Sequence, residues 1–167
     1  MQNRMLLLAG PVLFIATSSL AADYPDIKAG LWSSTGTSSN AKVPPQTGNM
    51  CTNNDVIKAL AQMQKGPNRP CKAVSHTQSG STYTTQTECN FGGTVKKTTA
   101  VTTAIGDTAL HTEIHDSDGS IVMTTDMKYV GACPAGMEPG DYVGANGGMK
   151  FNVLKMADTA PPAPPPH

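Results

Sequence analysis

Apolar and polar side chains alternate with a period of two through the middle of the chain, over residues 71–130. This alternation is typical of β-strands that bury one face. Clusters of Gly, Ser and Asp interrupt it at four places, residues 79–81, 92–93, 106–107 and 116–119. Because such residues form tight turns, the pattern predicts five consecutive strands joined by hairpins, an antiparallel meander rich in Thr and Val.

The alternation also assigns the side chains of this meander to two faces. In the fourth strand the apolar face carries Leu110, Thr112 and Ile114, and the opposite face carries His111, Glu113 and His115. The apolar row of the fifth strand holds Ile121, Met123, Thr125, Met127 and Tyr129, and that of the third strand holds Val95, Thr99, Val101 and Ile105. We expect these rows to form one continuous apolar face that packs on a helix.

The lengths of three turns predict the register of the strands that they join. We take residues 79–81 as a three-residue turn, residues 106–107 as a two-residue turn and residues 116–119 as a four-residue loop. The opposed pairs are then Ser75 with Thr85, Thr103 with Leu110, and Ile114 with Ile121. The last two pairs keep the apolar rows of neighbouring strands together.

The turn at residues 92–93 does not fit the apolar rows in the same way as the other three turns. As a plain two-residue turn it would set the apolar row of the next strand on the wrong face, because a slip of one residue reverses every side chain. We therefore expect Thr94 to join this loop in a β-bulge, so that Phe91 faces Val95.

Four cysteines, Cys51, Cys71, Cys89 and Cys133, lie in the body of the chain. An even number of cysteines in an exported protein predicts disulfides, and the long gaps between them lack the C-x-x-C spacing of zinc and redox sites. The turn at residues 79–81 places Cys71 opposite Cys89, and opposed cysteines of antiparallel strands reach disulfide distances. The predicted pairs are therefore Cys71–Cys89 and Cys51–Cys133.

Outside the meander, the chain predicts few regular elements. Residues 27–35 predict a first strand, residues 36–48 a loop, and residues 149–154 a last short strand. Residues 52–65 predict the one helix, with Thr52 as its N-cap. The predicted fold is mainly β (α+β): a curved antiparallel β-meander of about six strands packed on one α-helix, with two disulfides.

The N-terminus has the pattern of a cleavable signal peptide, residues 1–21. Arg4 supplies a positive charge, and residues 5–16 are an uncharged apolar run. Small residues follow, and they place the cleavage after Ala21, with Ala22 as the neighbouring option. The apolar run is shorter than the roughly 20 residues that a membrane-spanning helix needs.

The rest of the chain predicts one exported domain, residues 22–156, and a tail, residues 157–167. A total of 167 residues suits a single domain. Residues 160–167 of this tail are mostly proline and cannot pack into a core, so we expect the tail to be extended and disordered.

Composition and charge narrow the classes of function. The chain has 12 basic and 12 acidic residues and no basic stripe, which excludes an electrostatic nucleic-acid interface. It contains no G-x-S-x-G elbow, H-E-x-x-H helix or phosphate-cradling loop, and we name no catalytic residue and no cofactor. We therefore expect the protein not to be an enzyme.

Histidines and methionines are the candidate metal ligands. His111 and His115 lie on one face of a strand roughly 13 Å apart, too far for one ion, although His76 on another strand could join one of them. Several of the nine methionines resemble the soft ligands of copper sites: Met123, Met127, Met137, Met149 and Met156. Solvated histidines and core-filling methionines explain the same residues without a metal, and we assign none.

Four short motifs resemble a known family. They are Ile27-Lys28-Ala29-Gly30-Leu31-Trp32, Met50-Cys51-Thr52, the spaced Cys71 and Cys89, and Gly131-Ala132-Cys133-Pro134. Together they resemble the small exported bacterial proteins called domain of unknown function 3617. The resemblance implies a Gram-negative periplasmic setting. It implies no activity and no functional residue.

Two classes of function remain open. The first is a non-enzymatic envelope module whose curved apolar face binds a small apolar ligand, a lipid or a protein partner. The second is a periplasmic copper- or metal-handling protein that uses His and Met, or an enzyme of unrecognised type. We expect the first.

Overall fold

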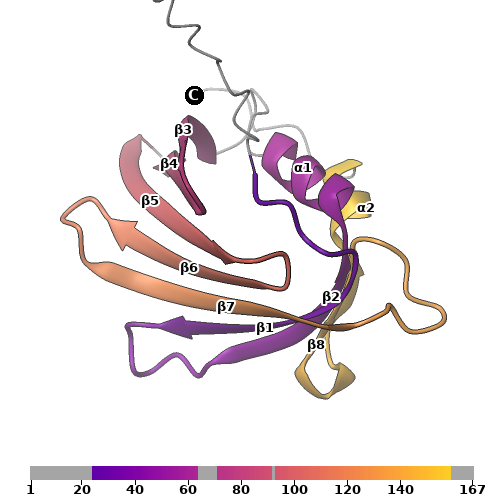
Figure 1. The fold of residues 1–167 in the computed structure, drawn as a ribbon. Coiled ribbons are helices and arrows are strands. Elements are labelled where there is room, and N and C mark those ends of the chain that lie inside the picture. Colours follow the sequence, from indigo (N-terminus) through magenta and orange to yellow (C-terminus); the bar gives the residue numbers. More distant parts are fainter. Residues whose placement is uncertain (1–23, 64–70, 92, 159–167) are drawn as a thin grey trace, which may run out of the picture.

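One strongly curved β-sheet makes up most of the computed structural model, which describes residues 24–63, 71–91 and 93–158 (Figure 1). Within these residues nine antiparallel strands lie side by side in the order β3-β4-β5-β6-β7-β1-β2-β8-β9. Their bounds are β1 Gly30–Ser38, β2 Gln46–Thr52, β3 Cys71–Ser79, β4 Thr82–Phe91, β5 Thr94–Ile105, β6 Ala109–Asp116, β7 Ile121–Gly131, β8 Asp141–Gly144 and β9 Lys150–Asn152. Helix α1 (Asn54–Met63) lies across the concave side of the sheet, next to the short helix α2 (Val153–Asp158).

The mainly β fold with two disulfides is confirmed, but the predicted number of about six strands is wrong. Strand β2 begins inside the segment predicted as a loop, and β8 and α2 were not predicted at all. The sequence of β2 is polar and does not alternate, yet the strand pairs with β1 on one side and with β8 on the other. Its conformation is therefore fixed by its neighbours in the sheet and not by local propensity.

Helix α1 begins one residue later than predicted. The side-chain oxygen of Asn53 accepts a hydrogen bond from the Val56 backbone N–H at 2.9 Å, so Asn53 is the N-cap in place of Thr52. Thr52 is the last residue of β2, and its side chain is buried. The predicted end of the helix, at residue 65, lies outside the described residues, as do the predicted signal peptide and most of the tail.

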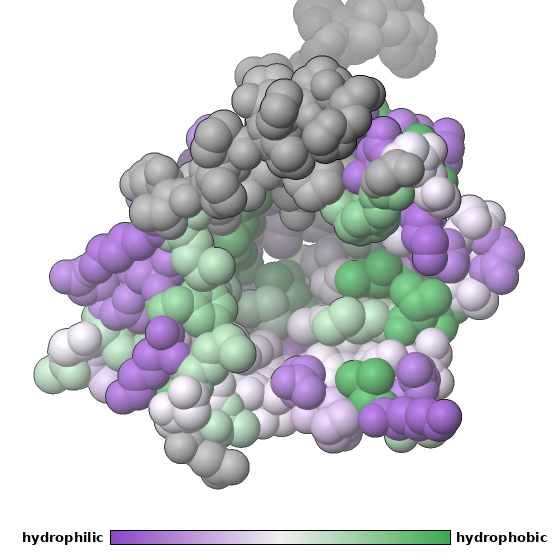
Figure 2. Space-filling view, turned by 180° about the vertical axis from the view of Figure 1, so that it is seen from behind, coloured by the Kyte–Doolittle hydropathy of each residue, from purple (hydrophilic) through white to green (hydrophobic). Residues whose placement is uncertain are grey.

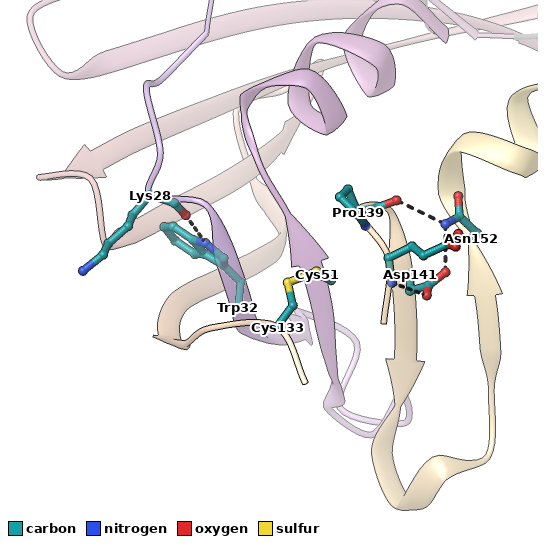
Figure 3. Close-up of a disulfide and its surroundings, with 8 residues drawn as sticks. Lys28, Trp32, Cys51, Cys133, Pro139, Asp141 and Asn152 are labelled. Carbon is teal, nitrogen blue, oxygen red and sulfur yellow. Dashed lines mark hydrogen bonds between the residues drawn. A yellow bond between two sulfur atoms is a disulfide. The ribbon is translucent and has the colours of Figure 1, made fainter. Parts of the chain in front are cut away.

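The core is small and centres on Trp32 of β1, whose side chain is fully buried. It packs with Ile27 and Leu110, and partly buried side chains of α1, β5 and β7 surround this cluster: Ile57, Ala104, Met127 and Tyr129. The Trp32 indole N–H donates to the Lys28 carbonyl at 2.8 Å, which fixes the ring in place (Figure 3). The core thus joins α1 to the β1, β6 and β7 part of the sheet.

The disulfides link Cys51 with Cys133 and Cys71 with Cys89, the same pairs that the sequence predicts. The first ties β2 to the segment that follows β7, next to Trp32 (Figure 3). The second crosses the β3–β4 hairpin, where Cys71 lies directly opposite Cys89. No helix within the described ranges is long and apolar enough to cross a membrane.

The register of the β3–β4 hairpin differs from the prediction in its outer half. The turn has two residues, because Ser79 pairs with Thr82, and not the three that the sequence predicts. A bulge between Ala73 and Ser75 restores the predicted register further along, so that Cys71 still meets Cys89. Ser75 pairs with Gln86 and not with Thr85.

Both turns that flank β5 also differ from the prediction. The bulge expected at Thr94 is absent, since Phe91 pairs with Thr94 across a plain two-residue turn. The Asn90 side-chain oxygen accepts a hydrogen bond from the Gly93 N–H at 2.9 Å and stabilises this tight turn. At the other end, Ile105 pairs with Ala109, so the turn holds three residues and not two.

The β6–β7 hairpin contains a further correction. Ile114 pairs with Met123, and not with Ile121 as predicted. The loop is one residue longer than predicted, since His115 pairs with Ile121, and β7 carries one extra residue beside His115. The bulge keeps Ile114 and Met123 on one face and leaves Ile121 at the exposed end of the strand.

These registers reverse the predicted faces of β5. The row on the concave side, in line with Leu110 and Ile114 of β6, consists of small and hydroxyl side chains: Thr98, Ala100, Thr102 and Ala104. The aliphatic row that was predicted to face the helix points outward, and Val95 and Ile105 are 54% and 62% exposed. The side chains of β5 on the concave face are therefore smaller than the Val and Ile side chains that the hydrophobic pattern predicts there.

Candidate functional site

A cavity of about 340 Å³ lies between α1 and the concave face of β3–β6. Its helix side is apolar and consists of Ile57, Leu60 and Ala61. Tyr24 and Pro25, from the chain that leads to β1, close one side. Figure 2 shows the molecule from behind, hollowed at its centre, with apolar and weakly polar side chains around the hollow.

The floor of the cavity is the sheet, and it is rich in threonine. Five threonines from three strands line it: Thr85 and Thr87 of β4, Thr98 and Thr102 of β5, and Thr112 of β6. Ala100, Leu110 and Ile114 supply the apolar part of the floor. None of the lining residues that the structure describes is Asp, Glu, Lys or Arg. The described walls therefore combine an apolar helix with an uncharged, hydroxyl-bearing sheet.

Two hydrogen-bonded pairs organise this floor. The Thr102 and Thr112 hydroxyls lie 2.9 Å apart, and a ring nitrogen of His76, Nδ1, lies 2.8 Å from the Thr85 hydroxyl. The His76 ring also lies against the Tyr24 ring, with centroids 4.7 Å apart. These contacts hold His76 at the end of the cavity formed by β3 and β4.

The sequence did not single out these lining threonines as a site. The available indication was the scarcity of large aliphatic side chains at alternate positions of β4 and β5, which the sequence shows as a threonine-rich stretch. Without the register of the turns, the face occupied by these threonines could not be determined.

The histidines predicted as candidate ligands are divided between the two faces of the sheet. His76 lies on the concave side, whereas His111 and His115 lie on the convex side. The hypothesis that His76 joins one of the other two is therefore wrong. Glu113 lies between the convex pair, 3.6 Å from His111 Nε2 and 3.2 Å from His115 Nε2.

The candidate methionines are also dispersed. Met127 packs against the Trp32 cluster, and Met123 lies in the same row of β7. Met149 and Met156 lie near the C-terminal end of the described chain and are more than half exposed. Among residues 24–63, 71–91 and 93–158, no group of three or more His, Cys, Asp or Glu side chains is arranged to hold a metal ion.

Of the two convex histidines, His111 is hydrogen-bonded to a carboxylate that shifts its pKa. The Asp126 carboxylate, 2.8 Å from Nδ1, raises the pKa of His111 above its ordinary value of 6.5, mainly through their hydrogen bond. Charged His111 is thus favoured in the folded state. Its stabilising contribution is fully present below the unfolded pKa and is lost as the pH rises through the folded pKa.

Asp126→Asn should therefore lower the pKa of His111, as measured by NMR titration of the imidazole protons. Since both side chains are more than a third exposed, we expect this substitution to reduce the free energy of unfolding by only a few tenths of a kcal/mol at pH 5.5, with a smaller reduction at pH 9. Asp55→Asn on α1 is the control and should leave the His111 titration unchanged. A His111 pKa that does not fall in Asp126→Asn would contradict the assignment.

A second depression lies on the convex side of the sheet. It has a volume of about 470 Å³, larger than the concave cavity, and Val74 and Val101 form its apolar part. Charged side chains also line it, including the Glu88–Lys97 ion pair, whose N–O distance is 2.8 Å. The lysine of this pair is 68% exposed, so the charged wall of this depression, the convex groove, is in contact with solvent.

The family model described as "Protein of unknown function (DUF3617)" matches residues 27–133 of the chain. The chain belongs to the DUF3617 family. The DUF3617 match includes both disulfides, the Trp32 core and every lining residue of the concave cavity except Tyr24 and Pro25. Strands β8 and β9 and helix α2 lie beyond it. No curated protein and no solved structure matches the chain.

Proposed function

We propose that this DUF3617 protein is a non-enzymatic binding module of the periplasm and that it holds a small apolar ligand in the cavity beneath α1. The observation that carries the proposal is the cavity itself, about 340 Å³ between an apolar helix face and a sheet, with no Asp, Glu, Lys or Arg side chain in its described walls. Ligand pockets typically have volumes of about 300–1,000 Å³ and mostly apolar linings. A cavity of this size suits a compact ligand.

The concave cavity is a better candidate than the larger convex groove. Charged side chains line the groove, and two of them, Glu88 and Lys97, already pair with one another at its exposed wall. An apolar ligand that covered them would remove hydration without replacing it, which is unfavourable. On the concave side, the helix provides apolar contacts from above, and the described walls contain no charge to desolvate.

Export to the periplasm is part of the proposal. It is supported by the signal-peptide pattern of residues 1–21 and by the two disulfides, which are typical of proteins outside the reducing cytoplasm. N-terminal sequencing of the exported protein should find Ala22 or Asp23 as its first residue.

Titration with N-phenyl-1-naphthylamine tests the binding function. This uncharged dye fluoresces more strongly in apolar surroundings, and we expect saturable binding to the oxidised, exported protein. Ala100→Phe should weaken this binding at least about tenfold, because the new ring occupies the cavity above the middle of β5. Dye fluorescence measures the affinity directly.

The neighbouring residue supplies the matched control. Val101 points to the convex groove, so Val101→Phe adds the same ring to the other face of β5. This variant should bind the dye within about twofold of the wild-type affinity, as surface substitutions usually do. If Val101→Phe abolishes binding and Ala100→Phe does not, the ligand site is the convex groove and the proposal is wrong.

A further inference from the structure

The floor of the concave cavity has more hydrogen-bonding capacity than its described neighbours use. A threonine hydroxyl is one donor and two acceptors, so the Thr102–Thr112 pair retains a donor and several acceptor positions after its own hydrogen bond. The Thr85–His76 pair retains further capacity on the next strands. Both pairs belong to the sheet side, whereas the α1 side presents only carbon atoms of Ile57, Leu60 and Ala61.

His76 adds a second, independent observation. Its other ring nitrogen, Nε2, is buried and has no hydrogen-bond partner among the residues that the structure describes. Two other buried side-chain atoms share this state, on Thr52 and Gln78, but His76 alone of the three lines the cavity. Buried polar groups are usually paired, so a nitrogen left without a partner beside a cavity indicates a place for a polar atom of a ligand.

The charge of the lining restricts that polar atom. The described walls contain no Asp, Glu, Lys or Arg, so apart from the imidazole of His76 nothing there could neutralise an ionised headgroup, and enclosing an unpaired charge is strongly unfavourable. A hydroxyl oxygen, by contrast, can donate and accept, so it satisfies threonine hydroxyls and either tautomer of His76. The ligand group that fits is therefore an uncharged oxygen, and an alcohol fits best.

We infer that the ligand is an uncharged amphiphile, with its apolar part against α1 and a hydroxyl oxygen on the floor between the Thr102–Thr112 and Thr85–His76 pairs. This inference rests on the proposed binding function and adds the class of ligand and its orientation. It assigns to the floor threonines the role of selecting an alcohol over a hydrocarbon or a carboxylate.

Displacement of bound N-phenyl-1-naphthylamine by two ten-carbon compounds tests the inference. At pH 8, 1-decanol should displace the dye at lower concentration than decanoate, which is ionised. In the double variant Thr102→Val and Thr112→Val, which keeps the side-chain shapes and removes the hydroxyls, the affinity for 1-decanol should fall about tenfold, a typical effect of losing one or two hydrogen bonds. The dye itself should bind this variant at least as tightly as wild type.

The control is the same change on the convex side of β5. Thr99 and Thr103 pair with His115 and His111, so Thr99→Val with Thr103→Val should leave the 1-decanol affinity unchanged.

In the wild-type protein, 1-decanol should also shift the NMR resonances of the His76 ring nitrogens, which tests the site without any variant. Dye binding with no preference for 1-decanol over decanoate, or with no loss in the concave double variant, would overturn the inference and leave the proposed function standing. Failure of the dye to bind would overturn both.

Discussion

Replacing both Cys51 and Cys133 by Ala should lower the free energy of unfolding, measured with urea, by about 4.5 kcal/mol relative to the wild-type protein. The two cysteines are 82 residues apart, and a cross-link that closes so long a loop removes much conformational entropy from the unfolded chain. Small domains have total stabilities of about 5–15 kcal/mol, so this loss is a large share of the whole. Far-UV circular dichroism at increasing urea measures it.

The second disulfide is the matched comparison. Cys71 and Cys89 are 18 residues apart, and the same entropy argument gives about 3 kcal/mol for removing their link. The two variants also differ in the burial of the side chains that they remove. The Cys51 side chain is 1% exposed and packs next to the core, whereas Cys71 is only partly buried. A larger loss from the Cys71–Cys89 variant would contradict the loop-length argument.

Trp32→Ala should lower the free energy of unfolding by roughly 3–5 kcal/mol, as truncating a large buried aromatic side chain does. The ring is fully buried among Ile27 and Leu110, and it lies edge-on to Tyr129, with centroids 6.2 Å apart. Because Trp32 is the only tryptophan of the chain, the variant is followed by circular dichroism and not by tryptophan fluorescence.

Two further variants separate packing from hydrogen bonding at this position. Trp32→Phe keeps an aromatic ring but loses the N–H that donates to the Lys28 carbonyl, so its loss should be clearly smaller than that of Trp32→Ala. Val130→Ala changes a side chain that is 55% exposed and should alter stability by less than about 0.5 kcal/mol. Equal effects of Trp32→Ala and Val130→Ala would mean that the core lies elsewhere.

The sequence predicts those parts of the fold that depend on local chemistry. Alternation identified the meander, and the position of Cys71 opposite Cys89 followed from it, although the turn length assumed for that hairpin was wrong and a bulge near Ala73 compensates for the difference. The helix after Cys51 was also predicted, with an error of one residue in its N-cap. Strand β2 was missed because its hydrogen bonds to β1 and β8 form only in the assembled sheet.

The candidate site was less predictable, because it depends on register. We expected the hydrophobic pattern to decide which face of β5 points inward, and we introduced a bulge at Thr94 to satisfy it. In the structure the tight turn stabilised by Asn90 determines the register, and the aliphatic row faces outward. The cavity floor then consists of residues such as Ala100 and Thr102. An error of one residue in a turn length reverses both faces of the following strand, so the lining of the cavity could not be predicted without the exact turn lengths.

The orientation of β5, whose two faces are opposite to those predicted, keeps the cavity beneath α1 from being filled by side chains. Its two interleaved rows differ in bulk, and the bulkier one, with Val95, Val101 and Ile105, is turned away from α1. A hydrophobic chain usually gains stability by burying such a row. In this protein the aliphatic row of β5 stays outside the core, so its burial does not contribute to stability. The small Ala and Thr side chains of the other row leave the cavity volume open. The cavity beneath α1 thus depends on the lengths of the two turns that flank β5, and inserting or deleting a single residue in one of them would turn the aliphatic row toward α1 and fill the cavity.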